Sequence, residues 1–242
     1  MKKINTVLVT NDDGYNSYGI KLLISILKKF VKKIYIVAPE KNMSGSSRSI
    51  TLGKDIKFKK KSQFTWVING TPTDCIIFAL NFLFNVHKPD FIFSGINAGS
   101  NIGDEISYSG TVGAAFEGAI RGIPSLAISQ VVKNKKNDQF NVSKNQLYRI
   151  LPDVLTQFSE DNLLLNLNFP SCSIDDVKEL KIVRCSNQKE SDEIIINFNK
   201  STFKIGKMNV SKLEVCDDFN ELKKNHITLT PIATNLTKNI IS

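Results

Sequence analysis

Residues 3–14 read KINTVLVTNDDG, an apolar run that is followed by three polar side chains and a glycine. We predict a short buried strand over 3–10, which the polar residues break. Apolar side chains then recur at helical spacing through 20–30 and predict a helix with one buried face. A second strand is predicted at 34–38. This βαβ unit predicts two parallel strands joined by a right-handed crossover.

The same alternation of strands and helices continues to about residue 170. We predict that a helix begins at Thr71, which can cap its N-terminus. Pro72 suits the first helical position, and Asp74 completes a spacing like that of a capping box. The other predicted elements are short strands with a lysine-rich turn within 50–68, strands at 90–94, 125–129 and 163–167, a helix with Val112, Ala115, Phe116, Ala119 and Ile120 on one side, and a helix over 143–158 that Pro152 should kink or split.

Beyond Pro170 the pattern changes to strands without strong helices between them. These strands are predicted at 181–184, 193–198, 202–205 and 226–230. We therefore expect a single α/β domain over 1–242, with a core of about 1–170 around a mostly parallel sheet and a β-rich C-terminal extension of about 171–242. A polar, lysine-rich segment at 133–142 is a weak candidate for a linker.

Composition excludes several classes of protein. The chain has 242 residues, of which 41% are hydrophobic, so it can build a sizeable core. Its formal charge of +9 comes from lysines scattered in short runs, which are typical of a solvated surface. Two histidines, His87 and His226, exclude a multi-histidine zinc site within one chain, and no Gly-x-Ser-x-Gly elbow is present. Without a Cys-x-x-Cys motif, a signal-peptide core or an apolar run of membrane length, we expect a cytoplasmic protein that is not bound to a membrane.

Three polar segments follow predicted strands. They are Asn11-Asp12-Asp13-Gly14, the loop around Ser44, and the glycine-rich run at 95–103. In an open parallel sheet, ligands bind beyond the carboxyl ends of the strands. We therefore expect all three segments to meet at one edge of the sheet.

Adjacent carboxylates at the end of a strand predict a cation. Two like charges side by side either raise a pKa or recruit a positive ion. Asp12, Asp13, the Ser44 hydroxyl and the Asn97 amide offer only oxygen, which a hard divalent ion such as Mg²⁺ or Mn²⁺ prefers. An ordinary turn is the alternative, since Asn-Asp-Asp-Gly suits a turn well. A predicted phosphate site nearby favours the metal.

That second site is Ser109-Gly110-Thr111, at the start of a predicted helix. Free backbone N–H groups and the positive end of the helix dipole bind anions there, and the two hydroxyls add donors. The predicted phosphate-binding set also includes Asn11 and Gly99. Ordinary N-capping is the alternative reading of the serine or the threonine. Neither Gly-x-Gly-x-x-Gly nor a Walker loop occurs.

A metal beside a phosphate cradle, without a histidine base, indicates metal-assisted hydrolysis of phosphate monoesters. Stabilisation of charge must then supply most of the rate acceleration. We predict that Asp12, Asp13 and Asn97 are the catalytic residues. In this hypothesis Asp13 holds or deprotonates the attacking water, while Asn97 and the turn at 109–111 bind the phosphate.

Several motifs occur in a fixed order along nearly the whole chain. They are NDDG at 11–14, VAPE at 37–40 with Ser44-Gly45, GTPTDC at 70–75, SGINAG at 94–99 continuing through Ser109-Gly110-Thr111 to Glu117-Gly118, VRC at 183–185 and TLTP at 228–231. Taken together they resemble the SurE family, the survival-protein 5′/3′-nucleotidases. Two departures are that Tyr18 stands where the family usually has proline, and that 186–216 matches no pattern of the family.

The resemblance implies a Rossmann-like, three-layer core and one divalent cation per subunit, Mn²⁺ or Mg²⁺. Its metal ligands map onto Asp12, Asp13, Ser44 and Asn97. It implies a cytoplasmic homodimer or homotetramer, built partly by exchange of the C-terminal β extension. The expected substrates are nucleoside 5′- and 3′-monophosphates, and some members of the family also cleave short polyphosphate.

Two other functions fit parts of the sequence. The charge of +9 would suit a non-catalytic nucleotide or nucleic-acid binding protein, which should bind without metal and with a steep salt dependence. Because aromatic residues are not interleaved with the basic runs, we expect no stable nucleic-acid partner. A haloacid-dehalogenase-like phosphatase would need Asp-x-Asp after the first strand, whereas Asp12 and Asp13 are adjacent.

Overall fold

The computed structural model describes residues 4–132, 140–160, 162–187, 189–210 and 215–237. Its strands are β1 (Thr6–Thr10), β2 (Lys33–Pro39), β3 (Phe58–Ser62), β4 (Thr65–Ile68), β5 (Phe91–Ala98), β6 (Ser125–Gln130), β7 (Leu164–Phe169), β8 (Lys178–Ile182), β9 (Lys189–Asn197), β10 (Thr202–Val210) and β11 (His226–Pro231). Nine of them form one sheet in the order β3-β4-β2-β1-β5-β6-β7-β11-β8. The strands from β4 to β7 in this order all pair in parallel.

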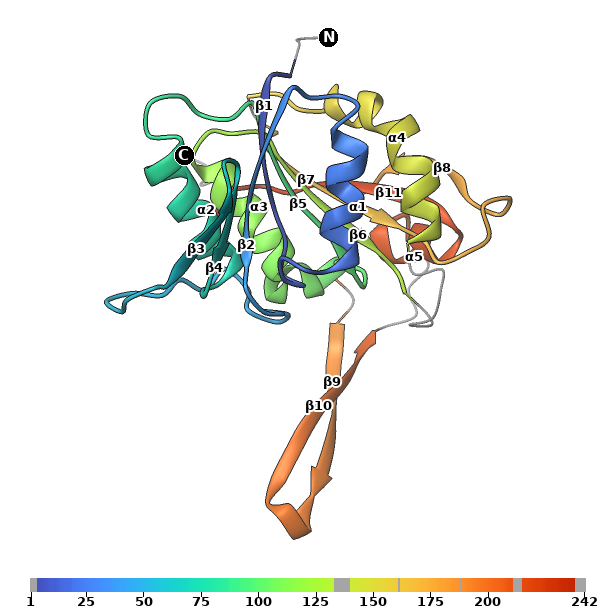
Figure 1. Cartoon of the computed structure of the whole chain (residues 1–242). Coiled ribbons are helices and arrows are strands. Elements are labelled where there is room, and N and C mark those ends of the chain that lie inside the picture. The colour runs from blue at the N-terminus through green and yellow to red at the C-terminus, as the bar shows by residue number, and fades with distance from the viewer. Residues whose placement is uncertain (1–3, 133–139, 161, 188, 211–214, 238–242) are drawn as a thin grey trace, which may run out of the picture.

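Helices cover both faces of this sheet (Figure 1). They are α1 (Tyr18–Leu27), α2 (Pro72–Phe78), α3 (Gly110–Ile120), α4 (Asn141–Leu155) and α5 (Asp218–Lys223), with the π-helix η1 (Ala79–Leu83) and the 3-10 helices η2 (Gly103–Tyr108) and η3 (Phe198–Lys200). Helix α1 packs beside α4, and α2 packs beside α3. The predicted three-layer α/β fold with a mostly parallel sheet is therefore confirmed. None of the described helices is long and apolar enough to cross a membrane.

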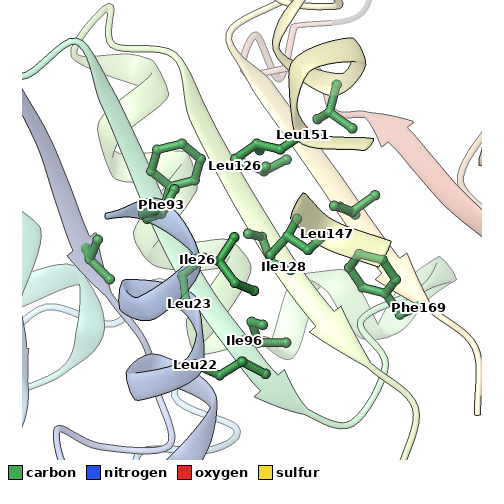
Figure 2. Packing of buried hydrophobic residues seen from close by; sticks show 14 of the residues in the cluster. Leu22, Leu23, Ile26, Phe93, Ile96, Leu126, Ile128, Leu147, Leu151 and Phe169 are labelled. Carbon is green, nitrogen blue, oxygen red and sulfur yellow. The ribbon is translucent and has the colours of Figure 1, made fainter. Parts of the chain in front are cut away.

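The largest part of the core lies under α1 and α4 (Figure 2). Leu23 of α1 and Leu147 of α4 are fully buried against the sheet, where Phe93 and Ile128 are also fully buried. The spacing of the apolar residues in 20–27 therefore produces the buried face that the sequence predicts. This packing fixes the sheet, and with it the ends of the strands where the polar loops begin.

The C-terminal region is rich in strands, as predicted, but these strands have two different positions. Strand β11 inserts between β7 and β8, antiparallel to the first and parallel to the second, so two C-terminal strands extend the main sheet. Only β9 and β10 form a separate antiparallel hairpin, which projects from the body (Figure 1). The short helix α5 lies between β10 and β11 in the sequence.

Two local predictions are wrong. The lysines at 59–61 lie in strand β3 and not in a turn, which falls at Gln63 and Phe64. All five residues of this edge strand are exposed, and charged side chains on an edge discourage pairing with another chain. Helix α4 is not split at Pro152, because this proline lies in its last turn. The linker predicted at 133–142 falls mostly outside the described residues, and Asn141 already begins α4.

A buried glutamate ties α5 to the neighbouring strand. The Glu221 side chain is 4% exposed and accepts hydrogen bonds from Lys181 of β8 at 2.6 Å and from Lys224 at 2.9 Å. These two ammonium groups lower the pKa of Glu221 from 4.5 to about 2. The ionised carboxylate therefore stabilises the C-terminal part of the sheet at pH values above about 4.5, and this contribution is lost as the pH falls toward 2.

Replacement of Glu221 by Gln should lower the free energy of unfolding at pH 7 by about 1–2 kcal/mol, because the lysines lose their charged partner and solvent screens these partly exposed ammonium groups. The difference from the wild type should shrink as the pH falls from about 4.5 toward 2, because the glutamate becomes protonated first in the unfolded chain and then in the folded protein. Urea unfolding at several pH values measures both effects. Glu179→Gln serves as the control, because the Glu179 side chain is 79% exposed. An equal loss at all pH values would contradict the role of charge.

Candidate active site

The three polar segments do meet at one edge of the sheet. Asp12 and Asp13 follow β1, which pairs with β2 on one side and with β5 on the other. The loop that contains Ser44 follows β2, and Asn97 lies near the end of β5. Because these strands are parallel, their carboxyl ends bring the segments together, as the sequence predicts.

Asp12 joins this edge to helix α3. Its carboxylate accepts a hydrogen bond from the Thr111 hydroxyl at 2.5 Å and another from the Thr111 N–H at 3.2 Å. Its carbonyl accepts from the Met43 N–H at 2.7 Å. One buried aspartate therefore fixes the end of β1, the loop after β2 and the start of α3 relative to each other.

Asp13 contacts the strand on the other side. One of its carboxylate oxygens accepts from the Ala98 N–H at 3.0 Å, and the other accepts from the Asn42 side chain at 3.4 Å. The sequence did not single out Asn42 or the Ala98 N–H. A backbone donor carries no sequence signal, because any residue except proline supplies it.

Both aspartates are held where a negative charge is unfavourable. Burial raises the pKa of Asp12, and the neighbouring Asp13 raises it further, while the hydrogen bonds from Thr111 lower it. Burial also raises the pKa of Asp13. A cation within reach of both carboxylates would relieve this cost.

The donor set suits a hard cation. Within the described part of the chain, no group of three or more His, Cys, Asp or Glu side chains is placed to hold a metal, so ligands beyond the two aspartates would be neutral. Asn97 fits this role, because its side-chain nitrogen donates to the Gly99 carbonyl at 3.0 Å and leaves the amide oxygen as the ligand atom. Ser44 is exposed and directly follows Met43, whose N–H is bound to Asp12. Oxygen ligands of this kind match Mg²⁺ or Mn²⁺.

A hydroxyl that the sequence did not single out also points into this space. The buried Ser46 Oγ has no hydrogen-bond partner in the described structure. A Cβ atom added at Gly110 would lie 2.6 Å from this oxygen and 3.0 Å from the Asp12 Cβ. Gly110 therefore keeps open a small space between Asp12, Ser46 and α3, and a polar ligand there would give the serine a partner. Ser46 lay within the polar loop that we predicted, but nothing in the sequence distinguished it from its neighbours.

The start of α3 offers fewer free donors than expected. The Thr111 N–H and hydroxyl both bind Asp12, and the Ser109 side chain accepts from the Val112 N–H as an N-cap. The Gly113 N–H donates to the Ser109 carbonyl. Among the described residues, the Gly110 N–H is the one backbone donor at the start of this helix that is left for a ligand, together with the Ser109 hydroxyl proton.

The other two residues of the predicted phosphate-binding set lie at the same edge. The Asn11 side chain donates to the Gly14 carbonyl at 3.0 Å and to the Ser17 hydroxyl at 2.8 Å, so it shapes the turn after β1. Its buried oxygen has no partner within the described residues. The Gly99 N–H donates to the Gln130 carbonyl at 2.9 Å. Both residues border the site, and their contact with phosphate stays a prediction.

A Rossmann-like sheet with a carboxylate pair and a helix N-terminus at one edge is the arrangement of α/β enzymes that act on phosphorylated substrates. The family model of the survival protein SurE matches residues 7–192. The chain therefore belongs to the SurE family, and the resemblance that its motifs carry is confirmed.

Relatives in this family are similar over nearly their whole length. A protein of Wigglesworthia glossinidia brevipalpis, named 5′/3′-nucleotidase SurE, is 39% identical over 238 residues, covering 96% of this chain and 93% of the relative. The 5′-nucleotidase SurE of Campylobacter lari is 39% identical over 240 residues, with 96% and 93% covered. The crystal structure of the SurE protein from Aquifex aeolicus superimposes with a TM-score of 0.82 at 32% identity, covering 96% of this chain and 94% of that one.

Replacement of Thr111 by Val keeps the shape of the side chain and the backbone N–H but removes the hydroxyl that binds Asp12. The pKa of Asp12 should rise further above its usual range, because this hydrogen bond lowers it. The free energy of unfolding should fall by about 1–3 kcal/mol at pH 7, and by less at acid pH, where a protonated carboxyl depends less on the donor.

Carboxyl titration by ¹³C NMR on metal-free protein, combined with urea unfolding, measures both effects. Thr156→Val is the matched control, because Thr156 is exposed and its hydroxyl bonds only to near neighbours in the chain, donating to the Asp153 carbonyl and accepting from the Gln157 side chain. An unchanged Asp12 pKa in Thr111→Val would show that the hydroxyl does not hold the carboxylate.

Proposed function

We propose that this chain is a metal-dependent phosphomonoesterase that hydrolyses nucleoside 5′- and 3′-monophosphates to nucleoside and phosphate. One divalent cation per subunit, Mn²⁺ or Mg²⁺, would be held by Asp12, Asp13, Ser44 and Asn97. Relatives named 5′-nucleotidase SurE, matched over 96% of the chain, support the substrate class. We extend the proposal to short polyphosphate, whose terminal phosphoryl group offers the same charge and shape.

The observation that carries the proposal is the pair of hydrogen bonds from Thr111 to Asp12. They hold the buried Asp12, with Asp13 next to it in the chain, against the N-terminus of α3, where the helix dipole favours an anion. Carboxylates alone would repel a phosphate, and a helix terminus alone would not activate water. Held together, the two features suit a cation and the phosphoryl group that the cation contacts.

The residues of this chain have separable tasks. A divalent cation, when bound, would polarise the phosphoryl oxygens and lower the pKa of a nearby water. Asp13 would hold that water or accept its proton, since its carboxylate is less buried than that of Asp12. The Gly110 N–H and the Ser109 hydroxyl would donate to the phosphate oxygens, and Asn97 would orient the phosphoryl group. Asp12, which Thr111 of α3 holds by two hydrogen bonds, would keep the cation next to these donors.

An exposed apolar face on the hairpin supports an assembly of several copies. Ile196 pairs with Phe203, and Ile194 pairs with Ile205, so these four side chains lie on one face of the hairpin. They are between 50% and 69% exposed, which is unusual for large apolar residues. We propose a homodimer or homotetramer in which this face is covered. Within the described residues none of the four cysteines forms a disulfide, which suits the cytoplasm, and we expect no stable nucleic-acid partner.

Phosphate release from a panel of nucleoside 5′- and 3′-monophosphates tests the function directly. Activity should be lost after treatment with EDTA and should return when Mn²⁺ or Mg²⁺ is added back. The decisive negative result is the absence of release with any metal, which would favour a nucleotide-binding protein without catalytic activity. That alternative also predicts metal-independent binding that weakens steeply with salt.

Asp13→Asn removes the charge that the cation and the water require while the side chain keeps its size. We expect kcat to fall to the background level, with an unchanged circular dichroism spectrum and a thermal midpoint that is not lowered, because burial disfavours the charge that is removed. Asp55→Asn is the matched control, because Asp55 is exposed outside the site. A folded Asp13→Asn enzyme with substantial activity would reject the catalytic role of Asp13.

A further inference from the structure

The loop that follows β5 is held by buried polar side chains. Asn101 of this loop is 6% exposed, and Ser129 of β6 and Asn166 and Asn168 of β7 are fully buried. None of these four residues belongs to the predicted metal ligands or to the predicted phosphate-binding set. Because solvent does not reach the three residues of the sheet, their polar groups must find partners inside the protein.

Asn168 binds the backbone of Asn101 at two points. The Asn101 N–H donates to Asn168 Oδ1 at 2.9 Å, and Asn168 Nδ2 donates to the Asn101 carbonyl at 3.0 Å. Asn166 Nδ2 donates to the same carbonyl at 2.7 Å, and the Asn101 side chain donates to the Ser129 hydroxyl oxygen at 2.7 Å. The Asn101 backbone lies in no helix or strand, so these side chains supply the hydrogen bonds that a regular element would otherwise give it.

The two asparagines are an expensive choice for a central strand. The alternate positions of β7 hold Leu165 and Leu167, which are also fully buried. A buried amide is unfavourable unless its polar atoms have partners, and Asn166 Oδ1 has none among the described residues. A leucine at the same position would avoid this cost. What the two asparagines contribute is therefore their hydrogen bonds to the loop.

The backbone that they hold leads directly to Asn97. Gly99 lies two residues before Asn101, and its N–H donates to the Gln130 carbonyl at 2.9 Å. The Gly99 carbonyl accepts from Asn97 Nδ2 at 3.0 Å, which turns the amide oxygen of Asn97 away from the loop and leaves it for a cation. A shift of the backbone over 99–101 would move this carbonyl, and the Asn97 amide would lose its orientation.

We propose that Asn168 and Asn166 are positioning residues for the cation ligand Asn97. They fix the Asn101 backbone, this backbone places the Gly99 carbonyl, and the carbonyl orients the Asn97 amide. The inference rests on the proposed function, because it concerns a ligand of the proposed cation. Asn168 holds two atoms of the loop and Asn166 holds one, so the loss of Asn168 should have the larger effect. A purely structural role would instead lower stability without changing the metal affinity of the folded protein.

The first test measures Mn²⁺ affinity by electron paramagnetic resonance. Asn168→Leu should weaken Mn²⁺ binding and lower kcat by about tenfold each, and Asn166→Leu should do so by about threefold. Ser125→Ala is the control for lost stability, because Ser125 is fully buried in β6 and its hydroxyl donates to the Ile123 carbonyl, away from the loop. Its Mn²⁺ affinity should stay within about twofold of the wild type.

The second test restores the lost donor with a proton. In Asn168→Asp, a protonated carboxyl can accept from the Asn101 N–H and donate to its carbonyl, whereas the ionised form cannot donate. Ser129 and Thr228, which pair with Asn168 on the neighbouring strands, carry no charge, so burial governs this carboxyl and raises its pKa.

The Mn²⁺ affinity of Asn168→Asp relative to the wild type should therefore be highest at about pH 6 and should fall by at least about threefold by about pH 8. Asn145→Asp makes the same change at an exposed asparagine that also donates to a backbone carbonyl, and its relative affinity should not depend on pH.

A folded Asn168→Leu variant whose Mn²⁺ affinity stays within about twofold of the wild type overturns the proposal. If that variant does not fold, Asn168→Asp decides, and a relative affinity that is the same at both pH values overturns it. If the wild type neither binds Mn²⁺ nor hydrolyses a nucleotide, the proposed function fails, and hydrogen exchange in the metal-free protein tests the positioning by itself. Faster exchange over 97–101 in Asn166→Leu but not in Ser125→Ala supports the positioning, and equal exchange refutes it.

Discussion

The hydrogen bonds between Asp12 and Thr111 are the contact on which the site depends. A carboxylate buried at the end of a central strand is unfavourable unless donors surround it. Thr111 supplies two of these donors from a helix on one face of the sheet, and the Met43 N–H ties the loop after β2 to the same residue. The sheet, the loop and α3 therefore share one fixed point.

The C-terminal part of the chain also stabilises the segment that leads into α3, through hydrogen bonds to Asp218. The buried carboxylate of Asp218 accepts from the Gly103 N–H at 2.9 Å and from the Ser186 N–H at 2.8 Å. Gly103 begins the 3-10 helix that leads into Ser109. Burial raises the pKa of Asp218, and these two donors lower it. The start of α3 is therefore held both from β1 and from the region around α5.

Local patterns predicted much of the fold, because periodicity and capping are encoded within a few residues. The capping box at Thr71 and Asp74 is present, and the strands of the parallel core lie where apolar runs occur. The insertion of β11 between β7 and β8 depends on contacts between distant segments, so no local pattern contains it. In the site, the position of both polar segments directly after strands of a parallel sheet predicted that Asp12 and Asn97 would converge. The commitment of both Thr111 donors to Asp12 could not be predicted, since a threonine after Ser-Gly also suits a free anion site.

Strand β11 is the last of the described strands in the sequence, so the sheet stays incomplete while the ribosome synthesises the chain. Within the described strands, β8 pairs only with β11, and β7 has β6 and β11 as its two neighbours. Translation proceeds at about 5–20 residues per second, so β7 leaves the ribosome several seconds before β11 does. During that interval a strand whose six residues are all buried in the mature protein presents an open edge. Nascent chains that stall between these two strands therefore present an edge that favours aggregation, and a chaperone that covers this edge would protect them.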